Sequence, residues 1–246
     1  MLRIALNSLP QSQLFRNAAV LGTIPRRWVA NTPQRSQESE AHVIAAQHPD
    51  KKSGILSKLQ KKFGWSGDSQ SKLKLSSYLI YESIVDRLNY VEFFRRFNLP
   101  NTFNSWFLVT ELHVWMVLTR AMAEGPERGE NGRFMRNCIV EAMWSDVNAR
   151  AKKLDPQNPS AAKKHIEILS HQFQAALINY DEGLMSDDKV LAGALWRRFF
   201  EKECNNYEML EDLVKYVREH VKMLEMLSND NFVQKPQVQW KDITSH

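Results

Sequence analysis

The segment 103–118 constrains the fold of this chain more than any other part of the sequence, because it is apolar on nearly every side. Trp106, Val109, His113 and Val117 recur at spacings of three or four residues, which is the period of an α-helix, and large apolar side chains occupy most positions between them. A helix of this kind has almost no polar face to turn toward water. The pattern therefore predicts a helix at the centre of a helical bundle.

Two polar residues, Glu111 and His113, interrupt this segment. With 16 residues and these two polar groups, it falls short of the roughly 20 mostly apolar residues that a transmembrane helix needs. Burial inside protein would require hydrogen-bond partners for both side chains. They are either structural groups with internal partners or polar contacts in a binding groove.

The rest of residues 76–228 also shows apolar residues at helical spacing, and β-branched runs bounded by turns are absent. We therefore expect an all-α fold, a single helical bundle-like domain of about six helices. Its expected helix boundaries are Pro100 with Asn101 or Thr102, a glycine-rich loop at 125–132, Asn158 before Pro159, Gly183, Ser186 followed by Asp187 and Asp188, and Asn205 with Glu208.

Charge divides the remaining chain into further regions. Residues 1–37 contain five Arg, no Lys and no acid, which predicts a mitochondrial presequence, with a disordered basic tail as the alternative. From residue 38 onward, basic and acidic residues balance at 28 each, so global charge gives no indication of a DNA partner. We expect a basic flexible linker at 38–75 and a polar C-terminal tail at 229–246.

A short part of the expected linker, 55–63, is amphipathic in helical projection. This pattern predicts a tether to an anionic membrane surface; a solvated linker or a contact with ribosomal RNA would use the same residues. The residues concerned are the apolar Ile55, Leu56, Leu59 and Phe63 and, on the opposite side, Lys58, Lys61 and Lys62.

Sequence signatures of catalysis are absent: there is no phosphate loop, nucleophile elbow or zinc-binding Cys pair. Cys138 and Cys204 are predicted to be buried apolar groups on helices. Four carboxylates cluster in a short acidic turn and could bind a cation, although the last two are also explained as charges at a helix N-terminus. These four are Asp181, Glu182, Asp187 and Asp188. We expect no cofactor and no metal site.

Trp196, followed by Arg197 and Arg198, has the composition that is favoured at the energetic centres of protein interfaces. The same three residues could equally be a core tryptophan beside solvated arginines.

Three long blocks, 99–116, 136–146 and 180–198, resemble the ubiquinol-cytochrome c chaperone family, and the resemblance covers about 78–228. It implies a non-enzymatic assembly chaperone for respiratory complex III on the matrix side of the mitochondrial inner membrane. It also implies that the chain binds newly made cytochrome b at the exit region of the mitochondrial ribosome, together with complex III assembly factor 2, a small Cbp6-like partner, and supports cytochrome b synthesis and stability.

A chaperone of this kind has to cover apolar helix surface on its client, so we expect an apolar groove with a polar rim. Two alternatives remain: a metal- or haem-handling helical enzyme that uses His171 and the acidic turn, and a ribosome-bound translation factor without client contact. The residues expected to bind client or partner are Trp106, Glu111, His113, Trp115, Asp181, Glu182, Asp187, Asp188, Trp196, Arg197 and Arg198.

Overall fold

The structure is a computed structural model that describes residues 69–123, 129–154, 156–234, 236 and 238–243. The expected presequence at 1–37 and the expected tether at 55–63 lie outside the described residues.

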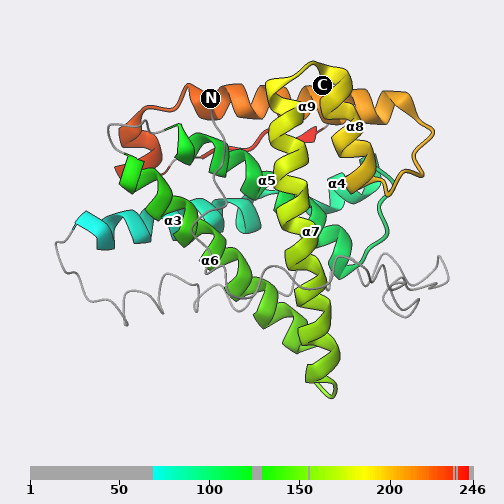
Figure 1. Ribbon diagram of the computed structural model, residues 1–246, viewed down its shortest axis with the longest axis horizontal. Coiled ribbons are helices and arrows are strands. Elements are labelled where there is room, and N and C mark those ends of the chain that lie inside the picture. The colour runs from blue at the N-terminus through cyan, green and yellow to red at the C-terminus, as the bar shows by residue number, and fades with distance from the viewer. Residues whose placement is uncertain (1–68, 124–128, 155, 235, 237, 244–246) are drawn as a thin grey trace.

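The described part of the chain is helical and contains no strand, which confirms the all-α prediction (Figure 1). It has seven α-helices and one short π-helix, where about six helices were expected. The expected first helix is divided in two, because the side chain of Asn89 accepts a hydrogen bond from Glu92 N–H and starts a new helix there. The elements are α3 (Ser69–Arg87), α4 (Tyr90–Arg96), α5 (Phe103–Met122), α6 (Gly129–Leu154), α7 (Pro159–Met185), α8 (Asp188–Phe199), α9 (Tyr207–Glu225) and the π-helix η3 (Asp230–Gln234).

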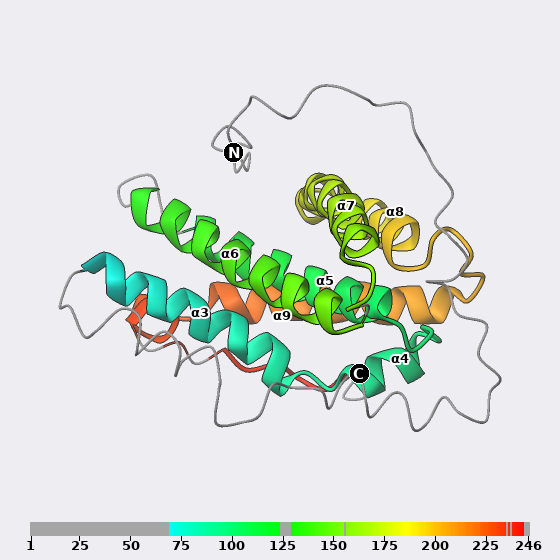
Figure 2. The same ribbon diagram turned by 90° about the horizontal axis from the view of Figure 1, so that it is seen from below.

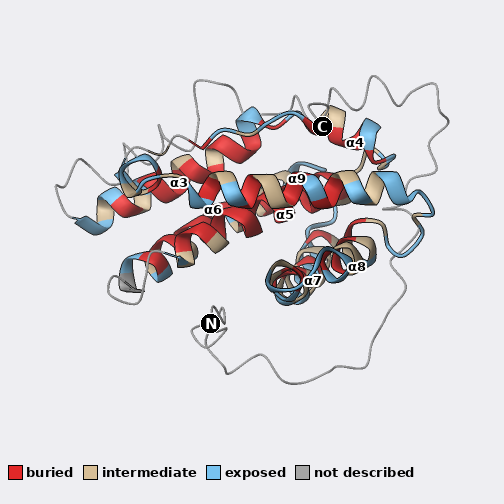
Figure 3. Cartoon of the chain, turned by 90° about the horizontal axis from the view of Figure 1, so that it is seen from above, coloured by how far each residue is buried: buried red, intermediate tan, exposed pale blue. Residues whose placement is uncertain are grey.

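Helix α5 lies at the centre of the bundle, as its apolar sequence predicts, and packs against α3, α4, α6, α7 and α9. Figure 3 shows it buried along most of its length. Helices α3 and α6 run alongside one another in Figure 2, while α7 and α8 form a pair that crosses the bundle. None of the described helices combines the length and the hydropathy needed to cross a membrane.

The cap residues agree with the sequence at two helices and differ at two. Thr102 caps α5, and Asn158, followed by Pro159, caps α7, as expected. Helix α8 is capped by Asp187 rather than Ser186, because Ser186 already ends α7. Helix α9 is capped by Asn206 rather than Asn205: its side chain accepts hydrogen bonds from the N–H groups of residues 208 and 209.

The expected glycine breaks are also different. Gly183 does not end α7, which continues to Met185. A Cβ atom added to Gly183 would lie 2.7 Å from the Cα of Leu191, so the missing side chain allows α8 to pack closely on α7. In the loop expected at 125–132, α6 already begins at Gly129.

The ends of the domain extend beyond the boundaries drawn from sequence. Helix α3 begins at Ser69, within the expected linker 38–75, and its Leu73 is buried. The segment expected as a polar tail packs on the bundle through widely spaced apolar residues that have no helical period. These residues are Phe232, Val238 and Ile243, all buried. Cys138 is buried in α6, whereas Cys204 is half-buried in the turn between α8 and α9 rather than on a helix.

Candidate binding groove

Glu111, one of the two polar residues in the central helix, is fully buried and forms a bidentate ion pair with Arg198 of α8. Arg198 Nε donates to one carboxylate oxygen at 2.8 Å and Nη2 donates to the other at 2.7 Å. Burial raises the pKa of Glu111 and the arginine opposes this rise, while the pKa of Arg198 lies above its usual value because of the carboxylate. The pair therefore links α5 to α8 inside the protein.

His113 is also buried, and both of its ring nitrogens have partners. Nδ1 lies 2.7 Å from the carbonyl oxygen of Val109, and Nε2 lies 2.8 Å from Tyr216 Oη. Because a carbonyl only accepts, Nδ1 carries the proton and Nε2 accepts from the tyrosine of α9. Burial lowers the pKa of His113 to about 3, so the ring is neutral at physiological pH.

The two tryptophans of α5 that were expected at a binding surface lie in the core. Trp106 stacks on Phe103, and the guanidinium of Arg150 lies 4.4 Å from the centre of its ring. Trp115 Nε1 donates to Asp181 at 2.9 Å, which joins α5 to α7. Trp106 and Trp115, like Glu111 and His113, are therefore enclosed by the bundle and offer no side-chain surface to a partner in this conformation.

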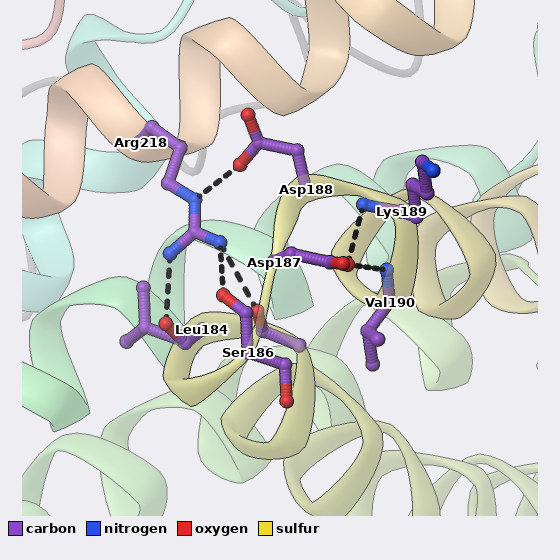
Figure 4. Close-up of polar contacts among 8 residues, drawn as sticks. Leu184, Ser186, Asp187, Asp188, Lys189, Val190 and Arg218 are labelled. Atoms are coloured by element: carbon purple, nitrogen blue, oxygen red, sulfur yellow. Dashed lines mark hydrogen bonds and ion pairs between the residues drawn. The ribbon is translucent and has the colours of Figure 1, made fainter.

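The acidic turn joins α7 to α8, and Figure 4 shows that its last two carboxylates have different partners. Asp187 Oδ1 accepts from the backbone N–H groups of residues 189 and 190, both at 3.0 Å. Asp188 pairs with Arg218 of α9 at 2.9 Å. The same arginine donates to the backbone carbonyls of residues 183, 184 and 186, so it satisfies the C-terminal end of α7.

The other two carboxylates of this cluster point to different surroundings. Asp181 is half-buried against Trp115, and burial raises its pKa. Glu182 is exposed, as is His171 in an earlier turn of α7. Within the described residues, no group of three or more His, Cys, Asp or Glu side chains is arranged to hold a metal ion.

The remaining expected residues, Trp196, Arg197 and Arg198, do not line the open groove described below, although Trp196 contacts one residue that does. Trp196 is half-buried and its Nε1 donates to the carbonyl oxygen of Cys204 at 3.1 Å, which fastens the α8–α9 turn to α8. Arg197 is exposed, whereas Arg198 turns inward to Glu111. Of the three, Trp196 and Arg197 are therefore the ones left near the surface.

The groove has a volume of about 480 Å³ and lies between the α4–α5 turn and the α8–α9 turn. These turns meet at one end of the bundle, at the right of Figure 2. The apolar residues that line the groove are Phe97, Leu99, Pro100, Leu108, Phe199, Phe200 and Met209. The polar residues that line it are Asn98, Thr102, Asn104, Ser105, Glu201, Glu203, Cys204, Asn205 and Asn206.

Sequence reasoning expected an apolar groove with a polar rim but did not identify these residues. Their local signal is weak: aromatic residues stand at two helix ends, Phe97 before Asn98 and Phe199 with Phe200 before Glu201. The two turns are about 100 positions apart in the chain, and helical periodicity does not relate one turn to another.

Comparison with known proteins agrees with the resemblance noted in the sequence. A family model described as ubiquinol-cytochrome C chaperone matches residues 95–240. The ubiquinol-cytochrome c reductase complex assembly factor 1 of Drosophila melanogaster is 62% identical over 190 residues, which cover 77% of this chain and 73% of that protein. The Homo sapiens protein of the same name is 38% identical over 197 residues, covering 79% of this chain and 64% of that protein.

More distant relatives are also similar. Protein CBP3, mitochondrial, of Saccharomyces cerevisiae is 31% identical over 143 residues, covering 57% of this chain and 42% of that protein. The crystal structure of the Cbp3 homolog from Brucella abortus has a TM-score of 0.55 and 20% identity, and covers 78% of this chain and 98% of that chain. At this identity the crystal structure supports the helical fold alone.

Proposed function

Because the chain belongs to the ubiquinol-cytochrome c chaperone family, we propose that it is a non-enzymatic assembly chaperone for respiratory complex III, the ubiquinol-cytochrome c reductase. The names of the similar proteins support this proposal: four are assembly factor 1 of this complex, and the yeast relative is described as mitochondrial. We place the protein on the matrix side of the mitochondrial inner membrane.

The proposed client is newly made cytochrome b, held together with complex III assembly factor 2 at the exit region of the mitochondrial ribosome. One structural observation carries the binding role, namely the 480 Å³ apolar groove with a polar rim. A chaperone has to shield apolar client surface from water and then release it. An open groove of this kind can bind an apolar segment of the client without enclosing it, so the segment can also dissociate.

The basic segment 55–63 is the proposed tether to the inner-membrane surface or to the ribosome. Its lysines and apolar residues suit an anionic surface. The tether would keep the groove near emerging client without a membrane span of its own.

The test is affinity purification of the tagged full chain from gently solubilised mitochondria, with mitochondrial translation active or blocked, followed by mass spectrometry and metal analysis. We expect a small partner together with cytochrome b, and we expect recovery of cytochrome b to fall when translation is blocked. A protein recovered alone with stoichiometric metal would overturn the proposal.

A variant lacking 51–65 separates the tether from the chaperone domain. We expect it to lose ribosome and membrane association while the helical domain still recovers the small partner. Unchanged association with both would exclude the tether, and loss of every interaction from this deletion alone would favour a translation factor without client contact.

A further inference from the structure

We propose that the groove selects an apolar helical segment flanked by basic residues, and that Glu201 and Glu203 provide this selectivity. This inference rests on the proposed function in one respect, namely that a membrane-protein client supplies such a segment. The preference for an apolar segment with basic flanks follows from the residues of the groove.

The interior of the groove is suited to an apolar helix face. Aromatic and aliphatic side chains from α5, α8, α9 and the two turns line it, including Phe97, Phe200 and Met209. Tyr207, which is 84% exposed, follows directly after the lining residue Asn206. Exposed tyrosine beside phenylalanine and methionine is the composition enriched at protein interfaces.

The charge of the rim has one sign. Among the residues that line the groove, the charged ones are Glu201 and Glu203, and both are exposed. Lys202 lies between them in the chain but does not line the groove, and nearby Arg198 is paired with Glu111 inside the protein. A ligand in this groove therefore meets two carboxylates, which attract Lys and Arg and repel phosphate.

The backbone of the turn that carries these glutamates is constrained. The described chain contains three non-glycine residues with positive φ, and all three lie in the two turns that form the groove: Asn98, Glu201 and Lys202. Glycine would adopt this conformation at little cost, whereas a glutamate there is strained. Lys202 N–H donates to Trp196 O at 3.1 Å, and Trp196 Nε1 donates to the carbonyl oxygen of Cys204, so the backbone of the α8–α9 turn is preorganised.

Basic flanks beside apolar helices are a general property of membrane proteins, because Lys and Arg concentrate on the side that is not translocated. The matrix-side end of a membrane helix thus offers both features that the groove matches. Anionic lipid headgroups and RNA are negatively charged, as the two carboxylates are, and would therefore be repelled by them.

The experiment uses the full chain and two labelled synthetic helical peptides of Leu and Ala, one with Lys at both ends and one with Glu at the same positions. Binding is measured by fluorescence anisotropy at low and high salt. We expect the Lys peptide to bind about tenfold more tightly than the Glu peptide at low salt, with a smaller preference at high salt. Equal binding of the two peptides, or no binding of either, would overturn the proposal.

The double variant Glu201→Lys/Glu203→Lys should reverse this preference. The matched control Glu167→Lys/Glu225→Lys makes the same change in net charge at exposed acids outside the groove and should retain it. Thermal unfolding of both variants checks that the fold is kept. A preference for the Lys peptide that survives in the first variant, or a dimer of the wild-type chain that this variant dissociates, would contradict the assignment.

Purification from mitochondria separates this inference from the function it rests on. If wild-type protein recovers cytochrome b and the Glu201→Lys/Glu203→Lys variant recovers as much, the groove assignment fails and the chaperone function stands. If the wild-type protein recovers no cytochrome b while the Lys peptide still binds selectively, cytochrome b is not the client, and the selectivity of the groove stands.

Discussion

At the level of single residues, the central helix carries two buried ionisable groups that are stabilised in different ways. Glu111 forms a bidentate ion pair with an arginine, whereas His113 is neutral and exchanges hydrogen bonds with a carbonyl and a tyrosine. Both solutions satisfy the requirement that buried polar groups have partners. The partners come from α8 and α9, so the two groups link α5 to each of these helices.

Removing one member of the ion pair should destabilise the protein strongly. We expect Arg198→Met to lower the free energy of unfolding by about 3–5 kcal/mol, because it leaves the fully buried carboxylate of Glu111 without its partner. Arg197→Met, at the exposed neighbouring position, should change it by less than about 0.5 kcal/mol. Urea unfolding measures both, and equal effects of the two variants would show that the pair is energetically unimportant.

His113 should make stability depend on pH. In the unfolded chain its pKa is near 6.5, and in the fold it is about 3, so between these values the unfolded state binds more protons. Stability from this residue is therefore complete above pH 6.5 and decreases as pH falls, by up to about 1.4 kcal/mol per pH unit.

Urea unfolding between pH 4.5 and 7.5 measures this contribution against other titrating groups. His113→Gln, which does not titrate, should have a flatter profile than wild type, and His171→Gln, at an exposed histidine, is the matched control. Parallel profiles for His113→Gln and wild type would refute the assignment.

At the level of elements, α7 and α8 form a closely packed helix pair that Arg218 of α9 fastens at its corner. Their close approach depends on Gly183, which faces the backbone of Leu191. Gly193 in α8 lies in a different environment: a Cβ atom there would have the end of the Arg197 side chain as its nearest neighbour, at 3.3 Å.

The two glycines should therefore respond oppositely to alanine. Gly183→Ala should destabilise the protein by about 1–3 kcal/mol, because the backbone of α8 has to move away. Gly193→Ala should stabilise it by about 0.5–1 kcal/mol, because the flexible arginine can move and alanine favours the helix. Thermal unfolding of the two variants gives the comparison, and a stabilising Gly183→Ala would contradict the packing described.

At the level of the whole molecule, the C-terminal segment completes the bundle. It packs η3 on α3, and Arg87 of α3 donates to the carbonyl oxygen of Val238 at 3.2 Å. His220 of α9 accepts from Lys241 N–H at 3.1 Å, and Arg120 of α5 lies over the ring of Phe232. The end of the chain thus joins its first described helix, its central helix and its last long helix.

Removal of this segment should destabilise the whole domain. A chain ending at residue 228 loses three buried apolar side chains, each worth about 1.5–3 kcal/mol, and should melt at a clearly lower temperature. Phe232→Ala tests the same contact in the full chain and should cost about 3–5 kcal/mol, whereas Gln239→Ala, at an exposed position, should cost little. A truncated chain as stable as the full one would show that the segment only rests on the surface.

Much of the fold was accessible from sequence because it depends on local rules. The continuous apolar character of 103–118 predicted the central helix, and Thr102 and Asn158 were recognisable as caps from their immediate neighbours. The groove was expected only as a type of surface. The four expected site residues on α5 are buried in the core. For Trp106 and Trp115, apolar helix positions look the same whether they face a neighbouring helix or a partner. For Glu111 and His113, the internal partners Arg198 and Tyr216 are distant in the chain.

The sequence by itself determined the helical class, the order of most helices and the family, since helical period, capping and long ordered blocks are all properties of neighbouring residues. Only the tertiary structure decided which polar groups meet. Arg198 is 87 positions from Glu111, and the two turns of the groove are about 100 positions apart. Such pairings arise from how the helices pack, and a pattern read along the chain carries no information on that packing.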